Sequence, residues 1–250
     1  MKRPVLLVLL LFATVAPCVG SVDVLLAATD AELQPLIAQL ESPHTETRAA
    51  WQFWTGTLRG KKVALTRTEG DPLNAVAATT LAIRRYVPRL VVTFGLARPE
   101  DPSLRSGDVV VSGSFVALDG MISPPRKPEA GSNALAWHKL AHPLMASGEV
   151  ENYSEHFPAD PAALEVAKNL SAGRGRLVIG VLGSANQVNR EADRIAWLHA
   201  QWGTSTEDGE SAHVAGCAQL LGVPVIGLRI VEGTDGEAAA LVMKFLEASK

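Results

Sequence analysis

The fold is indicated by residues 90–98, which read LVVTFGLAR and of which 90–95 are predicted to form a strand. The first five residues are apolar or β-branched, and the run ends in the charged Arg98. A strand that is apolar without alternation is buried on both faces, which requires helices on both sides of its sheet. Five further segments share this character and are predicted strands: 22–28, 62–66, 108–117, 177–183 and 223–229.

Segments with apolar residues at three- and four-residue spacing separate these strands. They are predicted helices: 30–40, 73–86, 161–170, 190–201, 210–221 and 237–248. The alternation predicts an α/β fold with a central, largely parallel twisted sheet covered by helices. A length of 250 residues allows one large domain or two small ones, and we expect a single domain over 21–250.

Composition and charge narrow the class of partner. Hydrophobic residues make up 47% of the chain, which is ample for a core, and the formal net charge of −3 argues against nucleic acid as a partner. The six histidines and Cys217 show no metal-ligand spacing, so we expect no metal and no other cofactor. Cys217 lies on the apolar face of a predicted helix and is interpreted as a buried thiol.

The N-terminus has the layout of a signal peptide. A basic start at Lys2 and Arg3 precedes an apolar run over 5–15 and small residues up to Gly20. The run is too short to span a membrane. We therefore expect a leader over 1–20 and export to the periplasm or the medium. The alternatives are a buried first element and lipid attachment at Cys18.

Residues 118–158 contain several prolines and little periodicity, and they are expected to form a long excursion over the active face.

Polar residues follow most of the predicted strands, where ligands bind in sheets of this kind. Strand ends lead into TDAE at 29–32, RTEGD at 67–71, GLAR at 95–98, GSANQ at 183–187 and RIVEGTD at 229–235. The sequence EDGE at 207–210 directly precedes a predicted helix. We expect these segments to line one site.

Six fragments, in order, carry a resemblance to a known family. They are AATDAE at 27–32, FWTGTL at 53–58, VVTFG at 91–95, LRSGDVVVS at 104–112, EDGESA at 207–212 and VPVIGLR at 223–229. With these segments the chain resembles the purine nucleoside phosphorylase superfamily, closest to the nucleosidases of methylthioadenosine and S-adenosylhomocysteine. The resemblance covers about 22–235 and implies a phosphorylase-like three-layer fold and a homodimer.

The resemblance also implies roles for individual residues. Glu32 matches the carboxylate that activates the attacking water, and Thr68 and Arg229 match residues that help to hold this water. Glu210 matches the carboxylate that binds the ribose hydroxyls. Val188 matches a position whose main chain addresses the edge of the adenine.

The sequence departs from the family pattern at the proton donor. The family's Ser-Asp pair corresponds to Glu232 and Gly233, so the expected aspartate is absent. Asp235, or Glu232 itself, is the candidate to replace it. Gly209 stands where the family usually has methionine.

Acidic residues in the turn after the second predicted strand, Glu69 and Asp71, argue for hydrolysis over phosphorolysis because they repel phosphate. The expected function is hydrolysis of the N-glycosidic bond of a purine nucleoside of the methylthioadenosine/S-adenosylhomocysteine type. A catalytically weak or inactive nucleoside-binding protein and a nucleoside phosphorylase are the alternatives.

Overall fold

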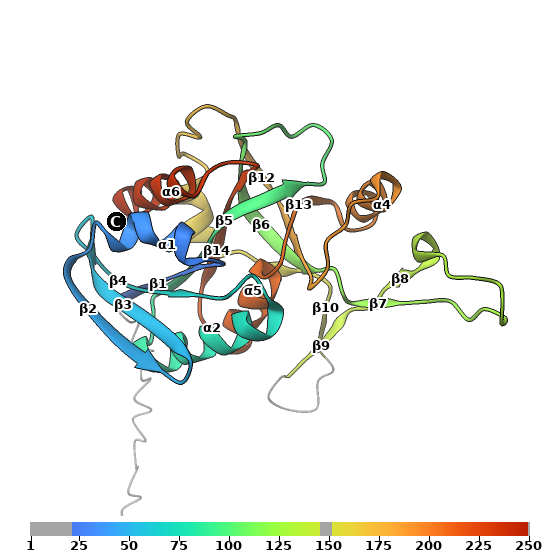
Figure 1. Cartoon of the computed structure of the whole chain (residues 1–250), viewed down its shortest axis with the longest axis horizontal. Coiled ribbons are helices and arrows are strands. Elements are labelled where there is room, and N and C mark those ends of the chain that lie inside the picture. Colours follow the sequence, from blue (N-terminus) through green and yellow to red (C-terminus); the bar gives the residue numbers. More distant parts are fainter. Residues whose placement is uncertain (1–21, 146–151, 250) are drawn as a thin grey trace, which may run out of the picture.

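The computed structural model describes residues 22–145 and 152–249. The leader expected over 1–20 lies outside these residues. Helices cover a ten-stranded sheet on both sides, and an excursion carrying β7 and β8 extends away from the body (Figure 1). The expected α/β fold is therefore confirmed.

Six strands of the sheet match segments that were predicted from their apolar runs. They are β1 (Val22–Ala27), β4 (Lys61–Arg67), β5 (Leu90–Pro99), β6 (Val109–Ala117), β12 (Leu177–Ser184) and β14 (Val225–Val231). β1 pairs in parallel with β4 and β5, β14 with β5, and β12 with β6. This parallel core agrees with the prediction.

The sheet also has strands that the sequence does not announce. They are β2 (Glu41–Arg48), β3 (Trp51–Leu58) and β13 (Thr204–Asp208), with two-residue β11 (Phe157–Pro158) at one edge. β2, β3 and β4 form an antiparallel meander, and β13 runs antiparallel to β5. β14 pairs with both β5 and β6, so β5, β13, β12, β6 and β14 close into a ring.

The helices match the predicted segments to within a few residues. They are α1 (Asp30–Ile37), α2 (Pro72–Tyr86), α3 (Pro161–Ala167), α4 (Ala192–Trp202), α5 (Ser211–Leu220) and α6 (Asp235–Ala248). α1 and α6 both begin with a capping box, in which a threonine and a glutamate three residues later bond to each other's backbone. These caps fix where each helix starts at the edge of the sheet.

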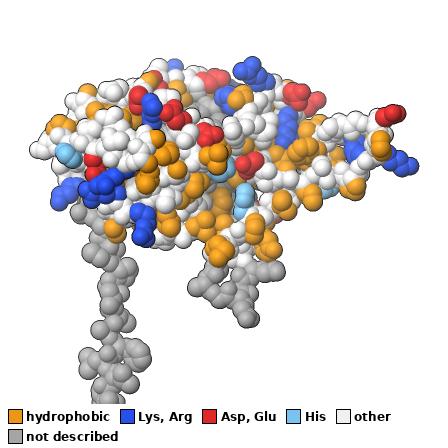
Figure 2. Space-filling model, turned by 60° about the horizontal axis from the view of Figure 1, so that its bottom comes forward, with side chains coloured by type: hydrophobic (Ala, Val, Ile, Leu, Met, Phe, Trp, Pro, Cys, Tyr) orange, Lys and Arg blue, Asp and Glu red, His pale blue; other side chains and the backbone are white. Residues whose placement is uncertain are grey.

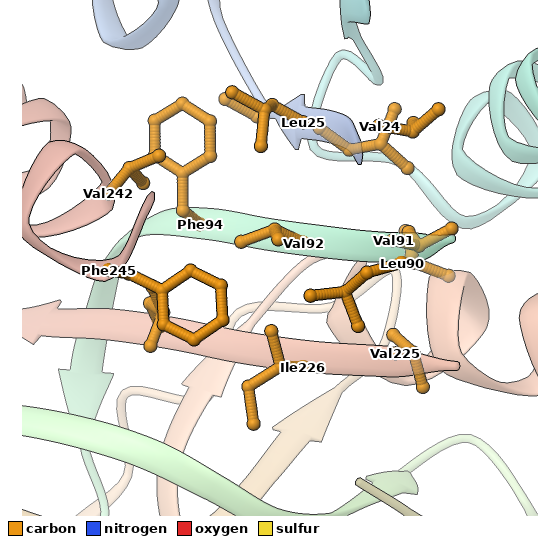
Figure 3. Close-up of a cluster of buried hydrophobic side chains, with 14 of the residues drawn as sticks. Val24, Leu25, Leu90, Val91, Val92, Phe94, Val225, Ile226, Val242 and Phe245 are labelled. Carbon is orange, nitrogen blue, oxygen red and sulfur yellow. The ribbon is translucent and has the colours of Figure 1, made fainter. Parts of the chain in front are cut away.

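The core lies between the parallel strands and α6. Val24 and Leu25 of β1, Val92 and Phe94 of β5 and Phe245 of α6 belong to one buried cluster (Figure 3). Burial of such side chains contributes roughly 1.5–3 kcal/mol each. The strand ends are thereby held in a fixed arrangement.

The described residues of the excursion, 118–145 and 152–158, form only short elements. They are β7 (Met121–Ile122), a 3₁₀ turn (Ala134–Ala136), β8 (His138–Lys139), β9 (His142–Leu144), β10 (Asn152–Ser154) and the edge strand β11 (Phe157–Pro158). β7 pairs with β8, and β9 with β10. Of the described residues, none forms a helix long and apolar enough to cross a membrane.

Candidate active site

A cavity of about 590 Å³ opens at the carboxyl ends of β5, β12, β13 and β14. Its lining includes residues of all six segments that were expected to meet: 29–32, 67–71, 95–98, 183–187, 207–210 and 229–235. This volume is within the range of pockets that bind small molecules. The parallel core thus positions one site, at the edge where the sequence predicted it.

Glu32 lies in the first turn of α1, and its side chain is 5% exposed. Oε2 accepts a hydrogen bond from the Thr29 backbone N–H at 3.1 Å, as part of the capping box. Oε1 accepts one from the Leu96 N–H at 3.1 Å. The helix cap and strand β5 therefore hold the carboxylate at the wall of the cavity.

Gly95 makes this approach of Glu32 to β5 possible. A Cβ atom at residue 95 would lie 2.3 Å from Glu32 Oε1, and Gly95 has a φ of +146°. Only glycine combines that conformation with the required space. The glycine that ends the VVTFG fragment is thus explained by the carboxylate beside it.

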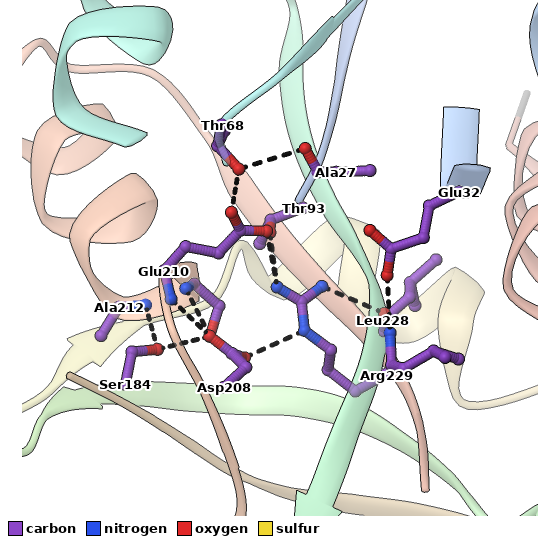
Figure 4. A network of polar contacts seen from close by, with 12 residues as sticks. Ala27, Glu32, Thr68, Thr93, Ser184, Asp208, Glu210, Ala212, Leu228 and Arg229 are labelled. Carbon is purple, nitrogen blue, oxygen red and sulfur yellow. Dashed lines mark hydrogen bonds and ion pairs between the residues drawn. The ribbon is translucent and has the colours of Figure 1, made fainter. Parts of the chain in front are cut away.

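Arg229 of β14 and Asp208 of β13 form a buried ion pair (Figure 4). Arg229 Nε donates to Asp208 Oδ2 at 2.9 Å, and Nη2 donates to Thr93 Oγ1 at 2.9 Å and to Glu210 Oε1 at 3.4 Å. The guanidinium is directed at carboxylates and a hydroxyl of the protein. Its expected role beside a water stays a prediction.

Asp208 accepts several further hydrogen bonds. Its Oδ1 receives the backbone N–H groups of Glu210 and Ser211, both at 2.8 Å, and the hydroxyl of Ser184 at 2.8 Å. Burial opposes ionisation, but Arg229 and these donors lower the pKa of Asp208 below its ordinary value. Burial lowers the pKa of Arg229, but the carboxylates of Asp208, Glu210 and Glu32 outweigh this effect and raise it above its ordinary value. Both groups are charged.

Glu210 is the N-cap residue of α5 and is 2% exposed. Burial, together with the charges of Asp208 and Glu32, raises its pKa to about 8, although Arg229 opposes this rise. The Thr68 hydroxyl contacts Ala27 O at 3.1 Å and also Glu210 Oε2.

The other end of the cavity is formed by the segment that follows β12. Val188 lines the cavity there, with Asn186 and Gln187. The Ala185 N–H donates to Asp208 O at 3.3 Å, which ties the segment to β13. Val188 thus lies in the cavity that also holds Glu32 and Glu210.

Gly209 lines the cavity between Asp208 and Glu210. A Cβ atom at residue 209 would lie 2.0 Å from the carbonyl oxygen of Gly70. The backbone of the 67–71 turn therefore occupies the place of a side chain. This close approach accounts for the glycine where the family pattern has methionine.

The two acidic residues that follow β14, Glu232 and Asp235, lie in different places. Glu232 lines the cavity, with a left-handed φ of 44°, and its N–H donates to Ala97 O at 3.2 Å. Asp235 is instead the first residue of α6, next to the N-cap Thr234, and does not line this cavity. Of the two candidates for the proton donor, Glu232 therefore lies at the cavity and Asp235 lies outside it.

Gly233 has no room for the aspartate of the family pattern. A Cβ atom there would lie 2.4 Å from Ile230 Cγ2. The loop therefore takes a course that excludes any side chain at this position.

The network includes residues that sequence reasoning did not single out. Thr93 belongs to a buried strand, and Arg98 and Glu207 line the cavity. Over residues 22–145 and 152–249, no group of three histidine, cysteine or acidic side chains is arranged to hold a metal ion. Cys217 is buried, and burial raises its pKa.

Comparison with known proteins agrees with this geometry. The family model described as "Phosphorylase superfamily" matches residues 23–250. The chain belongs to the phosphorylase superfamily. A curated relative, the 5'-methylthioadenosine/S-adenosylhomocysteine nucleosidase of Geobacillus thermodenitrificans, is 25% identical over 229 residues, covering 90% of this chain and 89% of the relative.

Solved structures of this superfamily have the same fold. The methylthioadenosine/S-adenosylhomocysteine nucleosidase of Neisseria meningitidis, in complex with methylthio-immucillin-A, gives a TM-score of 0.75 at 18% identity, covering 91% of this chain and 99% of that one. A futalosine hydrolase mutant of Helicobacter pylori gives a TM-score of 0.72 at 20% identity, covering 92% and 98%. The suspected family is confirmed.

Proposed function

We propose that this protein hydrolyses the N-glycosidic bond of a purine nucleoside. The observation that carries the proposal is that Glu32 and Glu210, far apart in sequence, are both buried and line one cavity of nucleoside size. The relatives named as nucleosidases of methylthioadenosine and S-adenosylhomocysteine support it.

Glu32 is proposed as the general base for the attacking water. Backbone N–H groups fix both of its oxygens in place. Each oxygen keeps a further lone pair that can accept a hydrogen bond from water. A positioned base of this kind contributes typically 10²–10⁴-fold to a rate. Preorganisation by the α1 cap and β5 supports this role.

Glu210 is proposed to accept hydrogen bonds from the ribose hydroxyls. Asp208 and Arg229 hold the start of α5, and with it Glu210, in place. Positive charge that develops on the sugar is stabilised by negative groups already oriented around it. By accepting hydrogen bonds from the ribose hydroxyls, Glu210 therefore supports the cation-like transition state.

Glu232 is proposed as the proton donor to the leaving base. It is the acidic residue of the 232–235 loop that lines the cavity, and its backbone is bonded to β5 beside Arg98. Because Gly233 has no space for a side chain, the neighbouring glutamate replaces the aspartate of the family pattern.

Hydrolysis is favoured over phosphorolysis by the charges in the cavity. Both arginines in its lining, Arg98 and Arg229, are paired with carboxylates. A phosphate ion there also meets the carboxylate of Glu32, which repels it. Water is the nucleophile that fits these surroundings.

A homodimer is proposed from the resemblance and from one apolar face. Leu73 and Val76 of α2, Leu220 at the end of α5 and Leu221 directly after it are exposed, and α2 packs beside α5. Figure 2 shows groups of hydrophobic side chains on the face turned forward. Exposed apolar patches of this kind mark association surfaces. Export, from the leader expected over 1–20, is likewise a proposal.

The proposed reaction is tested by measuring release of free base from methylthioadenosine, S-adenosylhomocysteine, adenosine and inosine, with and without phosphate. We expect base and free sugar to appear without phosphate, at a rate that phosphate does not raise. A strict requirement for phosphate, with a sugar phosphate as product, would show a phosphorylase. Nucleoside binding without base release would show a binding protein.

A further inference from the structure

Two charged residues of the cavity have no role in the proposed water and ribose sites. Arg98 of β5 and Glu207 of β13 face each other across the antiparallel pair of strands. Arg98 Nη2 donates to Glu207 Oε1 at 3.2 Å. The Glu207 side chain is 2% exposed and that of Arg98 is 48% exposed. A buried carboxylate and a more open guanidinium thus share one wall.

Contacts on both sides connect this pair to the segment that carries Val188 and to the loop that carries Glu232. The Asn189 N–H, directly after Val188, donates to Glu207 Oε1 at 3.3 Å. On the other side, the Glu232 N–H donates to the carbonyl of Ala97, the residue before Arg98. Arg98 therefore lies next to the proposed proton donor, with Glu207 against the segment that carries Val188.

The unused hydrogen-bonding groups of the pair define what it can recognise. Glu207 Oε1 already accepts two N–H groups, whereas Oε2 makes no hydrogen bond within 22–145 and 152–249. Arg98 uses one of its five N–H donors on Glu207. The pair itself therefore offers several donors beside a single free acceptor, and the amides of Asn186 and Gln187 line the same cavity.

We infer that the Arg98–Glu207 pair selects a 6-oxopurine base, such as hypoxanthine or guanine; the inference rests on the proposed nucleoside hydrolysis. Arginine donates well to the O6 and N7 acceptors of such a base. The neighbouring N1–H of the 6-oxopurine donates to Glu207 Oε2. The order acid, donor, acceptor in Glu232, Arg98 and Glu207 corresponds to N7, O6 and N1.

Adenine presents the wrong groups to this wall. Its exocyclic amine brings N–H donors toward the N–H donors of Arg98, and its N1 brings an acceptor toward the carboxylate of Glu207. Polar groups that are buried without a partner weaken binding, so a site built for one pattern rejects the other. Discrimination by such a pair amounts to about tenfold or more.

The inference is tested by comparing kcat/KM and Kd for inosine and guanosine with those for adenosine and methylthioadenosine. We expect the 6-oxopurine nucleosides to be favoured about tenfold or more in both quantities. A preference for the 6-aminopurine nucleosides in both would overturn the inference. Because Kd is measured independently of turnover, base selection is tested even if the protein releases no base.

Substitution of Arg98 identifies the residue responsible. Arg98→Gln replaces the guanidinium, which only donates, by an amide that both donates and accepts, so the preference for inosine over adenosine is expected to fall about tenfold or more. Arg59→Gln, in an exposed ion pair with Glu247, is the matched control and keeps the wild-type ratio. An unchanged ratio in Arg98→Gln would overturn the assignment.

The two proposals fail in different ways. Glu32→Gln tests hydrolysis: we expect it to lower base release from all nucleosides equally and to leave the base preference in binding unchanged. Glu207→Gln turns one carboxylate oxygen into an amide donor, and it is expected to weaken inosine binding more than adenosine binding. Circular dichroism of this variant separates a binding defect from misfolding.

Discussion

Arg229 and Asp208 are joined by a hydrogen bond of 2.9 Å between Nε and Oδ2, and both side chains are buried, with 1% and 7% exposure. Removing one partner leaves the other charge buried and unpaired. We expect Arg229→Met to lower the free energy of unfolding by about 3–5 kcal/mol. Denaturant unfolding measures this change.

The exposed pair of Arg59 and Glu247 provides the control for that experiment. Exposed ion pairs contribute about 0–1 kcal/mol, so Arg59→Met is expected to change stability little. Equal losses in the two variants would contradict the structural role of the buried pair.

The raised pKa of Glu210 predicts a loss of stability with rising pH. Its pKa is about 8 in the folded protein against an ordinary 4.5, so the folded state binds more protons between these values. Stability therefore falls as pH rises through this window toward 8. In Glu210→Gln this part of the loss is expected to disappear, which unfolding at pH 6, 7, 8 and 9 measures.

Glu100 provides a distinguishable second titration. It is buried, and burial raises its pKa to about 7. The loss of stability that Glu100 causes therefore ends about one pH unit below the loss that Glu210 causes. Glu100→Gln is expected to alter the dependence of stability on pH mainly below pH 7. A Glu210→Gln curve that keeps the wild-type slope between pH 7 and 8 would contradict the assignment.

Glu232 is expected to matter only when the leaving group needs a proton. We predict that Glu232→Gln lowers kcat for a purine nucleoside by about 10²-fold or more, because it removes the general acid. With 4-nitrophenyl riboside, whose leaving group departs as an anion, the same variant is expected to retain most of its rate. Asp235→Asn, at the start of α6, is the control and should leave both rates near wild type.

Gly209 is predicted to tolerate no side chain. Since a Cβ atom there meets the Gly70 carbonyl at 2.0 Å, Gly209→Ala must move the 67–71 turn or the start of α5. Overpacking of this kind costs typically about 1–3 kcal/mol. Gly236→Ala, which has open space around its added Cβ, is the matched control in thermal unfolding. Comparable melting temperatures for both variants would refute the close approach.

The apolar strands and amphipathic helices were predictable because burial on both faces leaves a continuous pattern. β2 was not, since its sequence ESPHTETR lies exposed at the edge of the sheet and has no apolar run. β13 was missed for another reason. Its sequence TSTED is polar, yet Thr204, Thr206 and Glu207 are buried by neighbouring strands and α4, which only the assembled fold reveals.

The site was predictable where a residue follows directly after a strand or begins a helix. Glu32, Glu210 and Arg229 meet as the order of segments implied. Asp235 did not, and the sequence held a signal for this: TDGE at 234–237 is a capping box, which places Asp235 in the first turn of a helix. The pairing of Arg98 with Glu207 depends on the register of β5 with β13 and had no local signal.

The central claim is tested most directly by Glu32→Gln, measured for base release without phosphate and for nucleoside binding. The substitution keeps the shape of the side chain and removes its ability to take a proton. We predict a fall in base release of about 10²-fold or more with nucleoside affinity within a few-fold of wild type. Base release at the wild-type rate in this variant would contradict the assignment of Glu32 to the attacking water.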